Sequence, residues 1–177
     1  MNLRHLIVLG LLLSVNISYA SKLTVPAGYQ TVAMSHGIPP KIFFAIALTE
    51  SRKKIYGKKV MPWPWTLNVE GKGYRYKNRK QAWVALNKYI SLKKSVDIGL
   101  MQVNWRYHSE KLKTPWLALD PYHNMRVSAK ILSQCYKNKG HWWLCVGRYH
   151  SPGRKESQVA RAQSYRQRVK EQYQRIS

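Results

Sequence analysis

The chain of 177 residues suits one compact domain with a single core, and its hydrophobic content of 45% excludes a disordered protein. Its 31 Lys and Arg residues outnumber 7 Asp and Glu residues, which gives a formal net charge of +24. Such a surface attracts polyanions, and any acid–base chemistry by carboxylates must use one of only seven side chains.

The first twenty residues have the pattern of an export signal. Basic residues precede an apolar run at 6–13, and a small-x-small cleavage site ends at Ala20. The run is shorter than the about 20 apolar residues that cross a bilayer, so an uncleaved anchor or a buried helix is less favoured. We predict a signal peptide at 1–20, a single domain at 21–177, export to the periplasm, and no transmembrane segment after signal removal.

An apolar helical pattern at 40–51 ends near a lone carboxylate, Glu50. The residues seven, four and three positions earlier are Phe43, Ile46 and Ala47, which share a helix face with it. Apolar surroundings raise the pKa of a carboxyl toward that of a useful general acid. Taken alone, the pattern favours a structural glutamate paired with the three cations that follow.

The next segments predict a small β region and a covering helix. Residues 66–76 have the pattern of two short strands joined by a turn around Gly71. From Asn78 the pattern becomes helical, with Trp83 and Leu86 on the face that covers the core.

A second informative block occupies residues 95–104. It combines a carboxylate at Asp97, a glycine that allows close backbone approach, and two amide side chains, Gln102 and Asn104, that can bind hydroxyls or acetamides. Asp97 is either a residue of the substrate cleft or a turn or cap residue, and the sequence leaves both interpretations open.

Three helices are predicted in the last third of the chain. The first begins at Asp120 and Pro121, a good N-cap followed by proline, and ends near Gly140. The second is a short Trp-rich helix within 141–150. The apolar stripe of the last, basic helix consists of Val159, Ala162, Val169, Tyr173 and Ile176.

The two cysteines, Cys135 and Cys145, lie on either side of Gly140. In an oxidising compartment they can form a disulfide that stabilises the fold by roughly 2–4 kcal/mol. A metal site is not expected, because no second cysteine pair or spaced histidine set accompanies them. No cofactor is expected either.

Three motifs in order resemble the soluble lytic transglycosylase family, which belongs to the lysozyme-like group. They are Glu50-Ser51 at the end of a helix, Gly-Leu-Met-Gln at 99–102, and Arg148-Tyr149-His150. The resemblance implies a mostly α, α+β lysozyme-like fold, in which a helical domain with a small β-hairpin region forms a substrate cleft.

The same resemblance implies a set of site residues. Glu50 is the single catalytic acid and then base, and peptidoglycan glycan strands are the substrate. The residues expected to line the sugar site, with Asp97 among them as a candidate, are Ser51, Asp97, Gln102, Asn104 and Tyr149. The family has Ala-Tyr-Asn where this chain has Arg148-Tyr149-His150, so His150 is the candidate to replace the asparagine.

Two alternatives and one narrower expectation accompany this reading. Residues 97–104 also resemble the lysozyme segment that holds a second carboxylate, which would make the protein a hydrolytic muramidase using Glu50 and Asp97. The basic surface would also suit a non-catalytic protein that binds DNA or the cell wall, although nucleic acid is not the favoured partner. Residues 62–68 and 147–152 resemble exported transglycosylases of conjugative elements, which makes components of a conjugation or type IV secretion apparatus candidate partners.

Overall fold

The computed structural model describes residues 23–55 and 60–177, and the predicted signal peptide lies outside these residues. The described chain forms eight helices and six short strands. The helices are α1 Ala27–Met34, α2 Pro40–Ser51, α3 Arg79–Ser91, α4 Trp105–Leu112, α5 Pro115–Ala118, α6 Pro121–Lys139, α7 Trp142–His150 and α8 Glu156–Gln174. The strands are β1 Arg52–Lys54, β2 Val60–Pro62, β3 Thr66–Val69, β4 Lys72–Arg75, β5 Val96–Ile98 and β6 Val103–Asn104.

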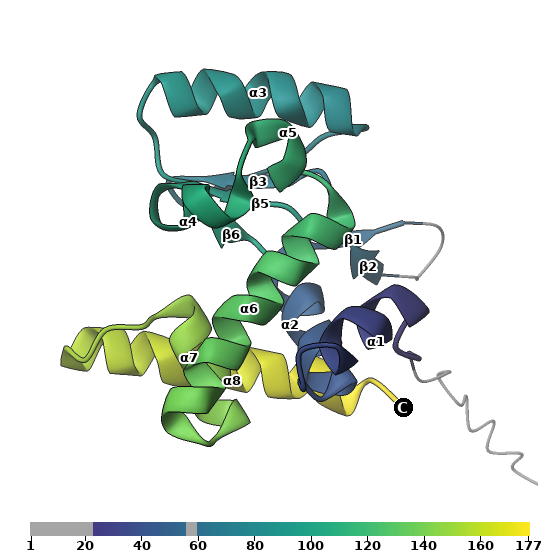
Figure 1. Cartoon of the computed structure of the whole chain (residues 1–177), viewed down its shortest axis with the longest axis vertical. Coiled ribbons are helices and arrows are strands. Elements are labelled where there is room, and N and C mark those ends of the chain that lie inside the picture. The colour runs from purple at the N-terminus through teal and green to yellow at the C-terminus, as the bar shows by residue number, and fades with distance from the viewer. Residues whose placement is uncertain (1–22, 56–59) are drawn as a thin grey trace, which may run out of the picture.

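Two groups of elements are arranged along the long helix α6 (Figure 1). One group holds α3, α4, α5 and an antiparallel sheet with the strand order β4-β3-β5-β6. The other holds α1, α2, α7 and α8, and α6 runs from one group to the other. The predicted mostly α fold with a small β region is confirmed.

The hairpin of β3 and β4 forms where the sequence predicted it. Val69 pairs with Lys72, so Glu70 and Gly71 form a two-residue turn. Both have positive φ, 50° and 91°, which is the conformation of a type I′ turn and matches the twist of the flanking strands. The hairpin supplies β3, the strand that pairs with β5 and so places Asp97 in the sheet.

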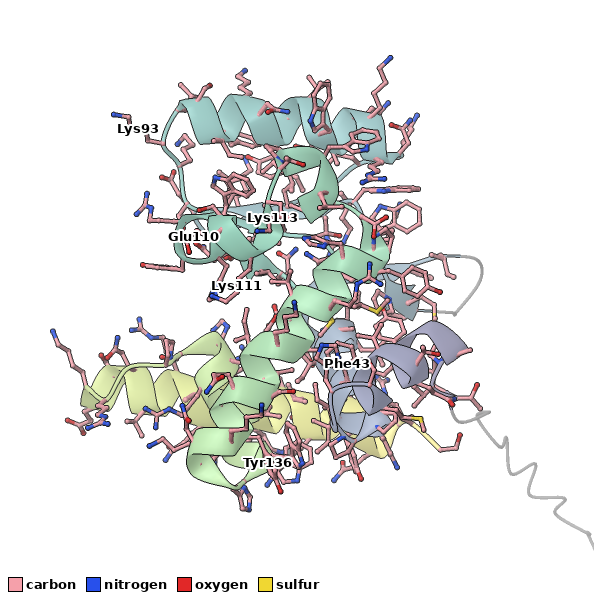
Figure 2. All side chains as sticks on the ribbon, in the orientation of Figure 1. Phe43, Lys93, Glu110, Lys111, Lys113 and Tyr136 are labelled. Carbon is pink, nitrogen blue, oxygen red and sulfur yellow. A yellow bond between two sulfur atoms is a disulfide. The ribbon has the colours of Figure 1, made fainter. Side chains whose placement is uncertain are left out.

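Helix α2 is buried on every side along its middle. It begins at Pro40, whose fixed φ suits the first turn, and the seven residues at 42–48 are all buried. Phe43, labelled in Figure 2, is one of them. The predicted apolar stripe is therefore part of a fully enclosed helix, as expected when a helix is apolar all round. The consequence is that a buried helix leads directly to Glu50 in its last turn.

Helix α6 has the predicted ends. The Asp120 carboxylate accepts a hydrogen bond from the backbone N–H of His123 at 2.8 Å, and Gly140 ends the helix with φ 66°. A disulfide between Cys135 and Cys145, with Cα atoms 5.7 Å apart, joins α6 to α7 and confirms the predicted bridge.

Two predicted core faces need correction. Trp83 is 37% exposed and meets Trp116 edge-on, because Ala82 and Leu86 are the residues of α3 that enter the core. In the last helix Val159 is 41% exposed, because the buried face of α8 consists of Ala162, Tyr165, Val169 and Gln172.

The two ends of the described chain meet. Ile176 is buried beyond the end of α8 and pairs with Leu23 in an isolated parallel bridge. Among residues 23–55 and 60–177, no helix combines the length and apolar character that crossing a membrane requires.

Candidate active site

Glu50 lies in the last turn of α2, where the helix leaves the core. The chain changes direction at Arg52, which takes extended dihedral angles and begins β1. The side chain of Glu50 is half-buried, whereas the residues at 42–48 behind it are buried. The helix thus fixes one carboxyl at the margin of the apolar core.

The surroundings of Glu50 favour its protonated form. Burial raises its pKa from the ordinary 4.5 to about 7, and the charge of Asp97 adds to this rise. A hydrogen bond from Tyr165 and the positive charge of Arg168 act in the opposite direction. A carboxyl with a pKa near 7 can donate a proton near neutral pH and then accept one, which is what general acid–base catalysis needs.

Tyr165 of α8 is the nearest polar neighbour of this carboxyl that the structure identifies. Its hydroxyl donates a hydrogen bond to Glu50 Oε1 at 2.6 Å, and its side chain is 1% exposed. The His150 ring stacks on the Tyr165 ring with centroids 4.6 Å apart and planes 5° apart. We did not predict Tyr165 from the sequence, although its position three residues after Ala162 and four before Val169 continues the buried stripe of the helix.

Replacing Tyr165 by Phe should shift the pH dependence of activity. The tyrosine hydroxyl bonds the charged form of Glu50 and lowers its pKa, so its loss should raise the pKa further above 7. A bond to a charged group corresponds to about one pKa unit, so the alkaline limb of the pH–rate profile should move up by about one unit. Tyr173→Phe on the same helix is the matched control and should leave the limb in place. An unchanged limb in Tyr165→Phe would contradict the role.

The loop at 99–102 turns back sharply between β5 and β6. Gly99 and Gln102 both have positive φ, 81° and 47°. The Gln102 side-chain amide donates hydrogen bonds to Gly99 O at 2.9 Å and to Thr66 O at 3.2 Å. These bonds occupy its N–H groups, so the amide oxygen is the atom of Gln102 that is suited to accept a bond from a substrate hydroxyl or amide.

Asn124 of α6 holds this loop from the core side, and we did not predict this role from the sequence. Its side chain is fully buried, and its Oδ1 accepts a hydrogen bond from Met101 N at 2.9 Å. Its Nδ2 donates to Ile98 O at 2.9 Å and to Ala118 O at 3.2 Å. A Cβ atom on Gly99 would lie 2.7 Å from Asn124 Cγ, so glycine at 99 is what lets the amide approach.

Ser51 and Tyr149 fix the same loop from two other helices. Ser51 is fully buried, and its hydroxyl donates to Leu100 O at 2.7 Å, which ties the end of α2 to the loop. The Tyr149 hydroxyl donates to Met101 O at 2.7 Å from α7. Ser51 therefore contacts backbone in this structure and has no exposed surface to offer a sugar, whereas Tyr149 is only half-buried.

Asp97 and Asn104 form a pair across β5 and β6. The Asn104 amide donates to Asp97 Oδ1 at 2.7 Å and to Ser95 Oγ at 3.0 Å. Burial raises the pKa of Asp97, while the bond from Asn104 lowers it. Asp97 lies in a strand, so it is neither a turn nor a cap residue, and its charge reaches Glu50 strongly enough to raise the pKa of that carboxyl.

His150 ends α7 and is exposed, apart from the ring face that stacks on Tyr165. Partial burial of the ring, together with the charges of Arg168 and Arg161, lowers the pKa of His150. The structure thus brings Glu50 of α2, Asp97 of β5 and the aromatic pair of α7 and α8 near one another.

Comparison with known proteins gives one match. The sequence model of a family described as transglycosylase SLT domain matches residues 29–173. No curated protein and no solved structure matches the chain. Within the described residues, no three His, Cys, Asp or Glu side chains lie together in a way that could hold a metal ion.

Proposed function

Because the chain belongs to the transglycosylase SLT domain family, whose members are lytic transglycosylases that act on peptidoglycan, we propose that Glu50 is its catalytic acid and base. The bond cleaved is the β-1,4 bond between N-acetylmuramic acid and N-acetylglucosamine. The product ends in 1,6-anhydro-N-acetylmuramic acid. The observation that carries the proposal is a carboxyl with a pKa of about 7 at the edge of the core, bonded by Tyr165.

The proposed reaction uses the carboxyl group of Glu50 twice, first as an acid and then as a base. Protonated Glu50 gives its proton to the bridging oxygen, and the bond from this oxygen to the anomeric carbon breaks. The substrate acetamide stabilises the oxocarbenium-like centre. The C6 hydroxyl of the same sugar then attacks the anomeric carbon while Glu50 takes the hydroxyl proton. Water does not take part, and Glu50 ends the cycle protonated as it began.

The neighbouring residues have two kinds of proposed role. Gln102 and the half-buried Tyr149 line the sugar site, and His150 closes it through its exposed ring edge. Asp97 and Asn104 act as a bonded pair in which Asn104 orients the carboxylate. Ser51 is a positioning residue, because its hydroxyl is committed to the loop at 99–102.

A hydrolytic muramidase is the second candidate, because Asp97 acts electrostatically on Glu50. In that mechanism Asp97 would stabilise or attack the anomeric centre, and water would complete the reaction. We favour the transglycosylase because the family match spans residues 29–173. A non-catalytic DNA- or wall-binding protein would need no carboxyl of raised pKa.

Mass spectrometry of the products from purified sacculi separates these candidates. We expect muropeptides lighter by one water than hydrolytic products, because the sugar's own hydroxyl replaces water. Asp97→Asn should keep this product, with a rate lowered by no more than about tenfold, because it removes a charge that raises the pKa of Glu50 and leaves the acid in place. Hydrated products, together with loss of activity in Asp97→Asn, would establish the muramidase instead.

We further propose that the protein works in the periplasm as a single domain at 21–177 after removal of residues 1–20. Action on the cell wall requires export, and the disulfide Cys135–Cys145 fits an oxidising compartment. The opening of the wall for a conjugation or type IV secretion apparatus is supported by the resemblance at 62–68 and 147–152. Co-purification of apparatus components with the protein tests this role.

A further inference from the structure

Two cavities lie along the C-terminal half of α6. The first, of about 310 Å³, lies between α6 and α7, and its wall includes Lys139, Arg148 and Tyr149. The second, of about 670 Å³, lies between α6, α4 and the end of α1, and its wall includes Lys111, Lys130 and Lys137. Both volumes are in the range of ligand sites.

The two cavities share part of their walls. Ile131 and Cys135 of α6 line both, so the cavities adjoin across this helix. One end reaches Tyr149, whose hydroxyl bonds the loop at 99–102 next to Glu50. The other end reaches Lys111, which projects from α4 on the side that faces α7 and α8 in Figure 2. The two cavities therefore adjoin along α6, and the first has Tyr149, a residue of the candidate active site, in its wall.

The walls of these cavities carry positive charge without compensation. We call the five cations Lys111, Lys130, Lys137, Lys139 and Arg148 the basic band. All seven carboxylate side chains of the sequence lie in the described residues, and none of them lines either cavity. The salt bridges within residues 23–55 and 60–177 are Arg79–Asp120 and Lys94–Glu70, so no cation of the band is paired there.

A histidine with a buried ring nitrogen, unpartnered within the described part of the chain, is among the residues that line the second cavity. His108 lines the second cavity, and its Nδ1 is buried with no hydrogen-bond partner among the described residues. The four exposed lysines of the band are suited to bind a ligand rich in carboxylates.

We propose that the basic band binds the acidic stem peptides of peptidoglycan while the glycan occupies the site at Glu50. The inference rests on the proposed function. Stem peptides branch from the lactyl group of N-acetylmuramic acid and carry free carboxylates, so they leave the glycan next to the scissile bond. Because Tyr149 and Arg148 of the band lie in the wall of the same cavity, a peptide on that sugar can enter the band directly. Apolar wall residues such as Leu132 and Pro152 suit its aliphatic parts.

The test compares peptide-bearing glycan strands with strands whose peptides have been removed by an amidase. The variant K130Q/K137Q/K139Q removes three exposed charges of the band and touches no proposed catalytic residue. The matched control is K77Q/K80Q/K88Q, three exposed lysines beside and on α3. We expect KM for peptide-bearing strands to rise about tenfold in the first variant only, and KM for peptide-free strands to stay unchanged in both.

Equal rises on both substrates, or the same rise in the control, would overturn the inference, because net charge would then explain the effect. A titration of the wild-type protein with a synthetic stem tripeptide, followed by NMR, gives an independent readout: shifts at His108 and the band are expected, and none in the variant. If single-stranded DNA of equal charge bound the band more tightly than the tripeptide and displaced it, the band would be assigned to nucleic acid. Wild type inactive on both strands but still binding the tripeptide would overturn the proposed function and not the site.

Discussion

Glu50→Gln should lower the rate of muropeptide release from sacculi by a factor of about 10² to 10⁴, which is the usual contribution of a general acid. Glutamine keeps the size and polarity of the side chain but cannot transfer a proton. The change leaves Tyr165 with an acceptor oxygen, so the geometry around the site should survive. Glu171→Gln, an exposed carboxylate on α8, is the matched control and should retain full activity.

The folding of Glu50→Gln can be checked through its pH dependence. In the wild type the folded pKa of Glu50 is about 7, above its ordinary 4.5, so the folded state binds the proton more tightly than the unfolded state does. Stability from this group is present below about pH 4.5 and is lost as the pH rises to about 7. The loss amounts to roughly 3 kcal/mol. Glu50→Gln should therefore unfold at higher denaturant than the wild type at pH 8, and equally at pH 4.

An inactive Glu50→Gln protein that is also less stable at pH 8 would mean that the carboxylate supports the fold. Undiminished release of muropeptides by a folded variant would remove Glu50 from the mechanism. The combination of lost activity with gained stability is specific to a catalytic carboxyl held in apolar surroundings at a cost to the fold.

Local patterns predicted most of the architecture because their causes are local. Pro40 and the apolar run after it specify α2, and Asp120 with Gly140 specifies both ends of α6. The turn at Glu70 and Gly71 requires positive φ at two adjacent positions, which glycine at the second makes inexpensive. Each of these signals acts within a few residues, so one sequence suffices to read it.

The neighbours of Glu50 could not be predicted in the same way. Tyr165 is 115 residues away along the chain, and on α8 it is one member of a buried face that also holds Ala162 and Val169. Tyr165 reaches Glu50 because α8 packs on α2, and no local sequence pattern predicts this packing. The hydrogen bonds from Ser51 to Leu100 and from Asn104 to Asp97 are similar cases. The sequence predicted that these polar residues lie near the site, but it did not predict their hydrogen-bond partners.

Asn124 is the clearest case of a residue whose importance only the packing reveals, and Asn124→Ala should cost about 3–5 kcal/mol of stability. Three backbone groups in the core, on Ile98, Met101 and Ala118, would lose their partner, and each buried unsatisfied group costs about 1–3 kcal/mol. Thermal unfolding should show a Tm lower by about 10 °C.

The activity of Asn124→Ala should fall by more than the loss of folded protein explains. The reason is that the loop at 99–102 carries Gln102 and accepts the hydrogen bonds of Ser51 and Tyr149. The matched control is Asn138→Ala, an exposed asparagine on the same helix, which should change the free energy of unfolding by no more than about 0.5 kcal/mol. If Asn124→Ala and Asn138→Ala lowered the free energy of unfolding by the same small amount, the three hydrogen bonds of Asn124 would not contribute to stability. If Asn124→Ala kept full activity below its Tm, the positioning of Gln102 would not depend on α6, and the loop would have to be held by Ser51 and Tyr149 alone.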